Sequence, residues 1–230
     1  TDGSRGTFSS GMATIFAARD AIEQMRKRAA KTWGIAVKNV SWKDGKAIAK
    51  GKRKSLTLKE LAEASPNTGG PISGHSQTVA DGAGVSFASH ICDVEVDPET
   101  GAVKVIRYTV VQDAGKAVHP DYVEGQFQGG AAQGIGWALN EEYVYNDNGE
   151  MSNSSFLDYR MPTTYDVPMI DTVIVEVPNP GHPYGVRGVG EVPIVPPPAA
   201  IANAIYNATG VRMNTLPMSP GRVLKAIGKI

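Results

Sequence analysis

The sequence of 230 residues contains a single cysteine, Cys92. One thiol cannot form an internal disulfide, and it cannot supply the thiolate cluster of a structural zinc or iron–sulfur site. Cys92 lies in an apolar run, which indicates a packed thiol. Ligand spacings such as HxH or HExxH are also absent from the four histidines, His75, His90, His119 and His182. The sequence therefore predicts no metal held by protein side chains.

The chain also lacks long apolar runs and a net charge. No run reaches the roughly 20 apolar residues that span a bilayer, and no signal peptide opens the sequence, so we expect a cytoplasmic protein without membrane contact. Lys and Arg total 23, as do Asp and Glu, which gives no overall attraction to nucleic acid. Twelve of the basic residues lie between Arg26 and Lys59, where Asp44 is the only acid. That stretch is either a solvated surface or a face for an acidic partner.

Hydrophobic residues make up 41% of the chain, enough for a sizeable core, and their spacing indicates both helices and strands. The expected fold class is α+β, a mixed α/β fold with β-hairpins and packed helices. Expected helices end at residue 33, run from 57 to about 65–66, and cover 120–139 and 199–208. Expected strands form hairpins at 39–51 and at 85–96 with 103–111, and lie at 142–145 and 172–177.

A Gly-, Ser-, Thr- and Pro-rich stretch at 67–84 predicts a long loop or linker. We expect residues 1–70 to form an N-terminal loop, a long helix and a small peripheral α/β subsection. Residues 71–230 are expected to form an α+β subdomain that carries the candidate site.

The most informative segment is the glycine loop at 185–193, which carries Glu191 just ahead of a proline-rich run and a helix. Gly188 and Gly190 allow a ligand to approach closely, either of them can take a positive φ, and the prolines are expected to block regular structure until the helix begins. Such a loop suits a glutamate that meets a bulky cofactor. An exposed acid in an ordinary strand-to-helix connection is the simpler alternative.

Two other segments are candidates for ligand contact. The first segment precedes the first helix and comprises Gly3, Ser4, Arg5, Gly6 and Thr7. The free N–H groups and the dipole at the N-terminus of this helix favour a phosphate. The alternative there is that Ser9 or Ser10 caps the helix. In the helix at 120–139, Gln133 offers both a hydrogen-bond donor and an acceptor to a ligand. A tight helix–helix contact is the alternative, since glycines surround it.

In this order the segments resemble the C-terminal part of the molybdopterin-binding subunit of the molybdenum hydroxylases, the family of xanthine dehydrogenase and aldehyde oxidase. The resemblance rests on Gly-Val-Gly-Glu at 188–191, Gly-Ser-Arg-Gly-Thr at 3–7, Ala-Gln-Gly-Ile-Gly at 132–136 and Asp-Tyr-Arg-Met-Pro-Thr at 158–163. It implies that Glu191 is the catalytic base and that Gly3 to Thr7, Gln133 and Gly190 contact the cofactor. Arg187 would steer a polar substrate or pair with the cofactor, whereas Asp158 and Arg160 would have structural roles.

The resemblance also implies an activity and partners. The activity would be oxidative hydroxylation of an aldehyde or an N-heterocycle, with a molybdenum–molybdopterin cofactor in its cytosine dinucleotide form. A complete subunit of this family has a long N-terminal half, so we expect either a split enzyme or a piece of a longer chain. Its partners would be a second molybdopterin subunit, an iron–sulfur subunit and an FAD subunit. A reductive relative, such as a hydroxybenzoyl-CoA reductase, and a non-catalytic assembly subunit stay open as alternatives.

Overall fold

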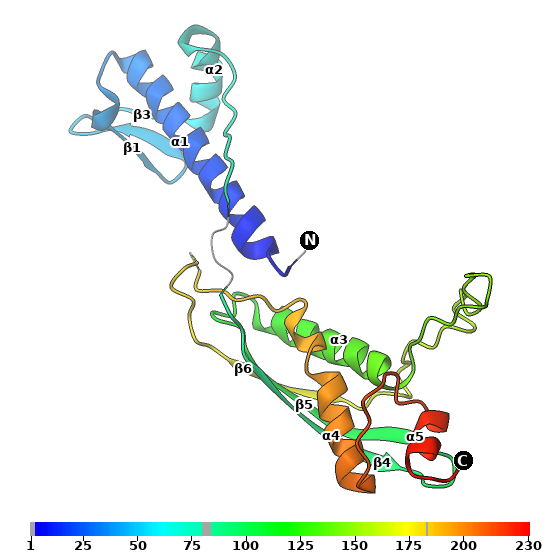
Figure 1. Ribbon diagram of the computed structural model, residues 1–230. Coiled ribbons are helices and arrows are strands. Elements are labelled where there is room, and N and C mark those ends of the chain that lie inside the picture. Colours follow the sequence, from blue (N-terminus) through cyan, green and yellow to red (C-terminus); the bar gives the residue numbers. More distant parts are fainter. Residues whose placement is uncertain (1–2, 80–83, 183) are drawn as a thin grey trace. The chain divides into compact units, whose positions relative to one another are not determined.

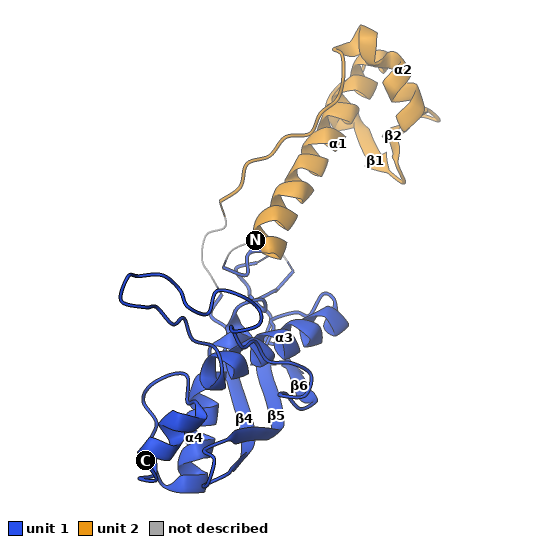
Figure 2. Ribbon diagram, turned by 90° about the vertical axis from the view of Figure 1, so that its right-hand side faces the viewer, with its two compact units in different colours: residues 1–5, 82–230 blue, residues 6–81 orange. Residues whose placement is uncertain are grey.

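The computed structural model describes residues 3–79, 84–182 and 184–230. Contacts between residues divide the chain into two compact units (Figure 2): unit 1 comprises residues 1–5 and 82–230, and unit 2 comprises residues 6–81. Both units contain helices and strands, which confirms the expected mixed α and β fold. The units are groups of contacting residues, so the expected domain division at residue 70 stays a prediction.

Unit 2 is built on one long helix, α1 (Gly11–Trp33), which follows a π-helical turn at Gly6–Ser10. An antiparallel sheet of β1 (Val40–Lys43), β2 (Lys46–Ala49) and β3 (Ser55–Thr57) leads into α2 (Leu58–Thr68). Buried residues of α1, α2 and the sheet form its core: Ala29, Ala30, Val40, Ala47 and Leu61. The structure thus confirms the expected helix and the hairpin at 39–51.

The ends of the two helices differ from expectation. Ser10 is itself helical and makes no side-chain cap, so neither expected serine cap is formed there. Helix α2 continues past Ser65-Pro66 to Thr68. The guanidinium of Arg28 donates to the carbonyls of Thr68 and Gly69, which gives the last turn of α2 partners that local sequence rules do not anticipate. Irregular chain follows to residue 79, and residues 80–83 of the expected linker lie outside the described residues.

Unit 1 is a three-stranded sheet packed against helices (Figure 1). The strands β4 (Ala88–Val96) and β5 (Val103–Asp113) form the expected antiparallel hairpin, and β6 (Ile170–Val175) pairs with β5 in parallel. Helix α3 (Pro120–Leu139) connects β5 to β6, and α4 (Pro197–Thr209) and α5 (Pro220–Ala226) follow. Side chains of the sheet, α3 and α4 share one core, including Tyr108, Val110, Phe127, Ile135, Ile201 and Ile205.

The strand directions indicate where in unit 1 a ligand site is expected, namely at the carboxyl ends of β5 and β6. Parallel strands end at the same edge, and here β5 ends at Asp113 and β6 at Val175. The loop that carries Glu191 follows β6. Ligands of open α/β sheets bind outside the carboxyl ends of the strands, so the topology puts Glu191 in the expected region.

Two sequence predictions about unit 1 are wrong. Residues 142–145 form no strand: Tyr145 and Met151 make an isolated bridge in a segment that leaves the body after α3 (Figure 1), and this bridge joins no sheet. The prolines after Glu191 do not delay regular structure, because Val192–Ile194 form a 3₁₀ turn and α4 begins at Pro197. Proline is suited to the first turn of a helix, where its missing N–H has no partner to lose.

Among the residues that the structure describes, no helix combines the length and the apolar character that crossing a bilayer requires.

A half-buried histidine of β4 makes the stability of unit 1 depend on pH. His90 Nδ1 lies 2.8 Å from the hydroxyl of Tyr108, and burial lowers the pKa of His90 to about 4. The unfolded chain binds this proton below about pH 6.5, so between pH 6.5 and 4 it holds more protons than the folded chain. The free energy of unfolding therefore falls as the pH falls through this window.

We expect this loss to be about 1–2 kcal/mol, less than the full pKa shift implies because His90 is only half-buried. Urea unfolding of wild type and His90→Gln between pH 4 and 7 measures it. The difference in unfolding free energy between the two proteins should shrink toward acid pH, since carboxylates titrate equally in both. If the unfolding free energies of the two proteins changed in parallel with pH, His90 would contribute nothing to the pH dependence of stability.

Candidate functional site

Two glycine loops that are far apart in the sequence meet in unit 1. The Ser4 hydroxyl accepts a hydrogen bond of 2.9 Å from the backbone N–H of Glu191, across a separation of 187 residues. Gly3 (φ 61°) and Ser4 (φ 54°) are both left-handed, which turns the chain toward this contact. The structure therefore brings one residue of the predicted anion loop directly to the predicted base.

The glycines of the Glu191 loop are required for space. A Cβ at Gly188 would lie 2.9 Å from Ser4 Cβ, and one at Gly190 would lie 3.3 Å from Ser4 Oγ. Neither glycine is left-handed; in this loop the positive φ belongs to Gly185 (67°). The expected positive φ at Gly188 or Gly190 is thus wrong. The expected close approach is confirmed for another part of the chain, Ser4, and stays a prediction for a ligand.

Helix α3 supports the loop from the other side. A Cβ at Gly130 would lie 2.5 Å from Pro193 Cγ, and one at Gly134 would lie 2.6 Å from Pro197 Cγ. These two glycines let the segment after Glu191 pack directly on the helix backbone. The compensation for their low helix propensity is therefore contact with the proline segment.

An exposed face of α3 adjoins this contact. It contains Gln133 and Gln126, which are about two helical turns apart and therefore share one side of the helix. A Cβ at Gly190 would come within 3.6 Å of Gln126 Oε1, and a Cβ at Gly125 or Gly129 would meet nothing within 4 Å. The face offers open glycine backbone and two amides beside the Glu191 loop. Sequence reasoning missed Gln126, although its spacing from Gln133 could have indicated it.

Glu191 itself is exposed, and it begins the short 3₁₀ turn at Val192–Ile194. Within the described residues its carboxylate makes no hydrogen bond or ion pair, whereas its backbone is held by Ser4. The backbone is fixed while the acid is left available to a ligand. This is the arrangement that a base needs before its substrate is bound.

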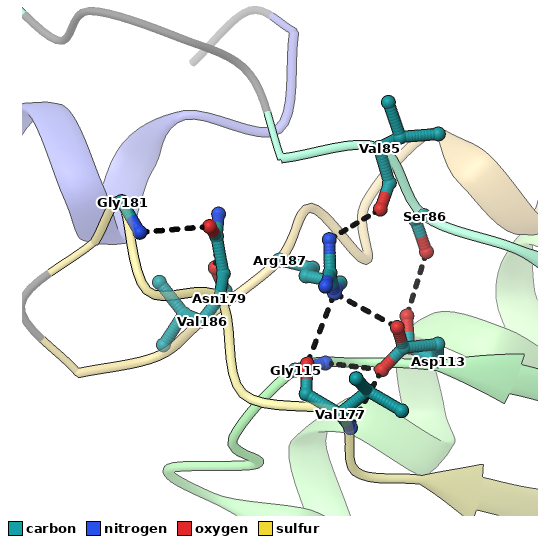
Figure 3. Close-up of polar contacts among 9 residues, drawn as sticks. All are labelled: Val85, Ser86, Asp113, Gly115, Val177, Asn179, Gly181, Val186 and Arg187. Carbon is teal, nitrogen blue, oxygen red and sulfur yellow. Dashed lines mark hydrogen bonds and ion pairs between the residues drawn. The ribbon is translucent and has the colours of Figure 1, made fainter.

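Arg187, four residues before Glu191, pairs with a carboxylate at the end of β5. Its Nε lies 2.8 Å from Asp113 Oδ2, and both side chains are largely buried (Figure 3). Asp113 is thus a partner that the sequence did not indicate, and the expected role of Arg187 in steering substrate or pairing with the cofactor stays a prediction. Sequence spacing could not reveal this partner, because Asp113 lies at the end of β5.

The remaining predicted site residues are placed as follows. Arg5 is exposed, and its side chain lies beside Gly3, where a Cβ would be 3.3 Å from Arg5 Nε. Gly6 and Thr7 belong to the π-helical turn of unit 2, with Thr7 exposed. Asp158 accepts a hydrogen bond of 3.0 Å from Ser155 within its own turn, as a structural role requires.

The described residues bring no three His, Cys, Asp or Glu side chains together as a metal site. Cys92 packs against the core of unit 1, as its apolar neighbours predicted. Burial raises the pKa of its thiol to about 12, so the thiol stays protonated and is a poor metal ligand.

The contact between Ser4 and Glu191 gives a direct prediction. Ser4→Ala removes the acceptor of the Glu191 N–H, so exchange of this amide hydrogen should accelerate about 3- to 10-fold, as expected for a hydrogen bond worth about 1 kcal/mol. Amide hydrogen exchange followed by NMR or mass spectrometry measures it, with Ser10→Ala as the control, because Ser10 is an exposed serine whose side chain makes no cap. An unchanged exchange rate in Ser4→Ala would show that the bond does not hold the loop.

Comparison with known proteins identifies related chains. The family model described as molybdopterin cofactor-binding domain matches residues 1–168. The xanthine dehydrogenase molybdenum-binding subunit of Escherichia coli O157:H7 is 39% identical over 172 residues, which cover 73% of this chain and 23% of that subunit. The carbon monoxide dehydrogenase large chain of Afipia carboxidovorans is 31% identical over 214 residues, which cover 90% of this chain and 26% of that one.

The crystal structure of quinoline 2-oxidoreductase from Pseudomonas putida 86 is similar over 99% of this chain and 30% of that chain, with a TM-score of 0.79 and 29% identity. The family model stops before Glu191, whereas this structural likeness extends over nearly the whole chain. The chain spans less than a third of the length of each of these relatives.

Proposed function

The chain belongs to the family of molybdopterin cofactor-binding domains, and we propose that it forms part of the active site of a molybdenum hydroxylase of the xanthine dehydrogenase and aldehyde oxidase type. The observation that carries this proposal is the hydrogen bond between Ser4 and Glu191, which joins the predicted cofactor loop to the predicted base. Without that contact, the two segments would be unrelated loops.

The residues present fit a molybdopterin cofactor. The glycines 125 and 129 leave open space above α3 for a flat ring system, and Gln126 and Gln133 supply amide donors and acceptors at its edge. Gly190 allows close approach where a side chain would intervene. We propose that Gly3 to Thr7 bind the phosphate and nucleotide end of the cofactor, and that Gln133 and Gly190, together with Gln126, contact the pterin.

When bound, the molybdenum cofactor supplies the centre that accepts two electrons from the substrate. In the proposed mechanism a carboxylate oxygen of Glu191 would accept the proton that is released as the substrate is hydroxylated. Such a base contributes about 10²- to 10⁴-fold to the rate. Its backbone is held by Ser4 and by the packing of Pro193 on α3, so the carboxylate is presented from a fixed support.

The proposal also includes partner proteins and a location in the cell. The related chains are three to four times longer than this one, as their coverage of 23% to 30% implies. One of them is described as a subunit and another as a large chain. We propose that the remaining molybdopterin-binding segment, an iron–sulfur protein and an FAD protein complete the enzyme, in the cytoplasm. The cofactor would be the cytosine dinucleotide form, and the substrate an aldehyde or an N-heterocycle.

Cofactor analysis of the purified native assembly tests the proposed function. We expect molybdenum in stoichiometric amount, CMP released by acid hydrolysis, and oxidation of an aldehyde or N-heterocycle with an artificial electron acceptor. Turnover only in the reductive direction would favour a reductive relative. An intact assembly that contains neither molybdenum nor pterin would refute the enzymatic proposal and favour an assembly role.

A further inference from the structure

We propose that Asp113 and Arg187 are positioning residues for Glu191, and this inference rests on the proposed function. Their buried ion pair fixes the start of the Glu191 loop to the carboxyl ends of β5 and β6 (Figure 3). This role differs from the expected one, in which Arg187 steers a substrate or pairs with the cofactor, and Asp113 was not among the predicted contacts. The proposal gives a function to the cation that lies four residues before the base and pairs with Asp113.

Asp113 joins three segments through one carboxylate. Its Oδ1 accepts hydrogen bonds from the N–H groups of Gly115 at 2.8 Å and Val177 at 3.0 Å, while Oδ2 pairs with Arg187 Nε at 2.8 Å. The residue is 7% exposed. A buried carboxylate with this many donors is rigid, because each of its oxygens is already engaged.

Arg187 uses its other donors on backbone carbonyls. Its Nε also donates to Val177 O at 3.1 Å, and Nη1 donates to Val85 O at 2.5 Å. The backbone N–H of Arg187 donates to Ala114 O at 3.0 Å. The guanidinium therefore connects the segment before β4, the segment after β6 and the Glu191 loop.

Close backbone packing locks the same junction. Gly115 has φ 64° and forms an isolated bridge with Val186, and a Cβ at Gly115 would lie 2.2 Å from Gly185 O. The loop thus leaves the sheet at one fixed point. This is a place where only glycine allows the approach.

Glu191 stands between two anchors. Arg187 holds the loop before it, while Ser4 and the packing of Pro193 on Gly130 hold it at and after the base. The residues between Arg187 and Glu191 include Gly188 and Gly190, which gain much conformational freedom if an anchor is lost. Loss of the ion pair should therefore misplace the carboxylate without removing any group that touches the substrate.

The test uses Arg187→Met and Arg187→Lys in the holoenzyme. For Arg187→Met we expect kcat to fall about 10- to 100-fold, because a misplacement of about 1 Å has an effect of this size. KM should change less than about 2-fold, since no ground-state contact is lost. Arg187→Lys should recover most of kcat, because its ammonium still pairs with Asp113. If Arg187→Met does not assemble, Arg187→Gln replaces it, as an uncharged side chain that still donates.

Two further readouts separate positioning from a general structural defect. In a Glu191→Gln background, Arg187→Met should have no further effect on the residual kcat, because its effect passes through Glu191. Independently of activity, amide hydrogen exchange at 188–191 should accelerate at least about 10-fold in Arg187→Met, while the amides of α3 stay unchanged.

A raised KM with unchanged kcat would overturn the inference and assign Arg187 to substrate binding. Unchanged exchange at 188–191 would overturn it as well, even if Glu191 is the base. Failure of the proposed function is read from a separate variant: full turnover by Glu191→Gln alone would refute the base itself, and the positioning role would fall with it.

Discussion

Replacing Glu191 by Gln is expected to lower kcat of the assembled enzyme by about 10²- to 10⁴-fold. The amide has nearly the shape of the carboxylate but cannot accept the proton. The Glu191 backbone, held by Ser4, and the open face of α3 are not changed by the substitution. Molybdenum and pterin content should therefore stay at the wild-type level, and steady-state kinetics normalised to molybdenum measure the effect.

Glu99→Gln is the matched control for this variant. Glu99 is also exposed and belongs to unit 1, but it lies in the turn between β4 and β5, at the opposite end of the strands from Asp113. It should retain wild-type turnover. If Glu191→Gln also retained wild-type turnover, Glu191 would not be the base. If this variant lost molybdenum, Glu191 would instead have a role in cofactor binding.

Replacing Gly134 by Leu is expected to lower the free energy of unfolding of unit 1 by about 3 kcal/mol. Its Cβ would lie 2.6 Å from Pro197 Cγ and 3.0 Å from Ile194 O, and neither a proline ring nor a backbone carbonyl can rotate away. The gain of about 1 kcal/mol in helix propensity is smaller than this clash. Because the displaced segment follows Glu191 directly, turnover should fall together with stability.

Gly221→Leu provides a control of equal size. Gly221 also lies in a helix of unit 1, α5, but a Cβ there would meet nothing within 4 Å. Its unfolding free energy should change by less than about 1 kcal/mol. Urea unfolding measures the free energy of unfolding of both variants. Equal values for the two would mean that the segment at 193–197 does not pack on α3.

Local signals in the sequence were sufficient for most of the elements. Helix α3 begins at Pro120 and the hairpin of β4 and β5 turns at 97–101, because proline at a helix start and an Asp-Pro-Glu-Thr-Gly turn act within a few residues. Residues 142–145 have the composition of a strand but find no neighbouring strand to pair with. Pairing is a property of the fold, so composition alone could not decide it.

The sequence indicated individual residues of the candidate site but not which of them lie in contact in the fold. The glycines at 188 and 190 and the amide of Gln133 were recognisable by residue type. That Ser4 holds the Glu191 backbone, and that Arg187 is bound by Asp113, depends on contacts between distant parts of the chain. The spacing of Gln126 from Gln133 indicates a shared helix face, but only the fold shows that this face lies beside Gly190.

A crystal structure of the enzyme with its molybdenum cofactor bound tests the central claim most directly. The account predicts that one cofactor is lined by the Glu191 carboxylate, by the amides of Gln126 and Gln133 and by the Ser4 loop, with Arg187 still paired to Asp113. A cofactor bound elsewhere, with Glu191 and the exposed face of α3 left in solvent, would contradict it.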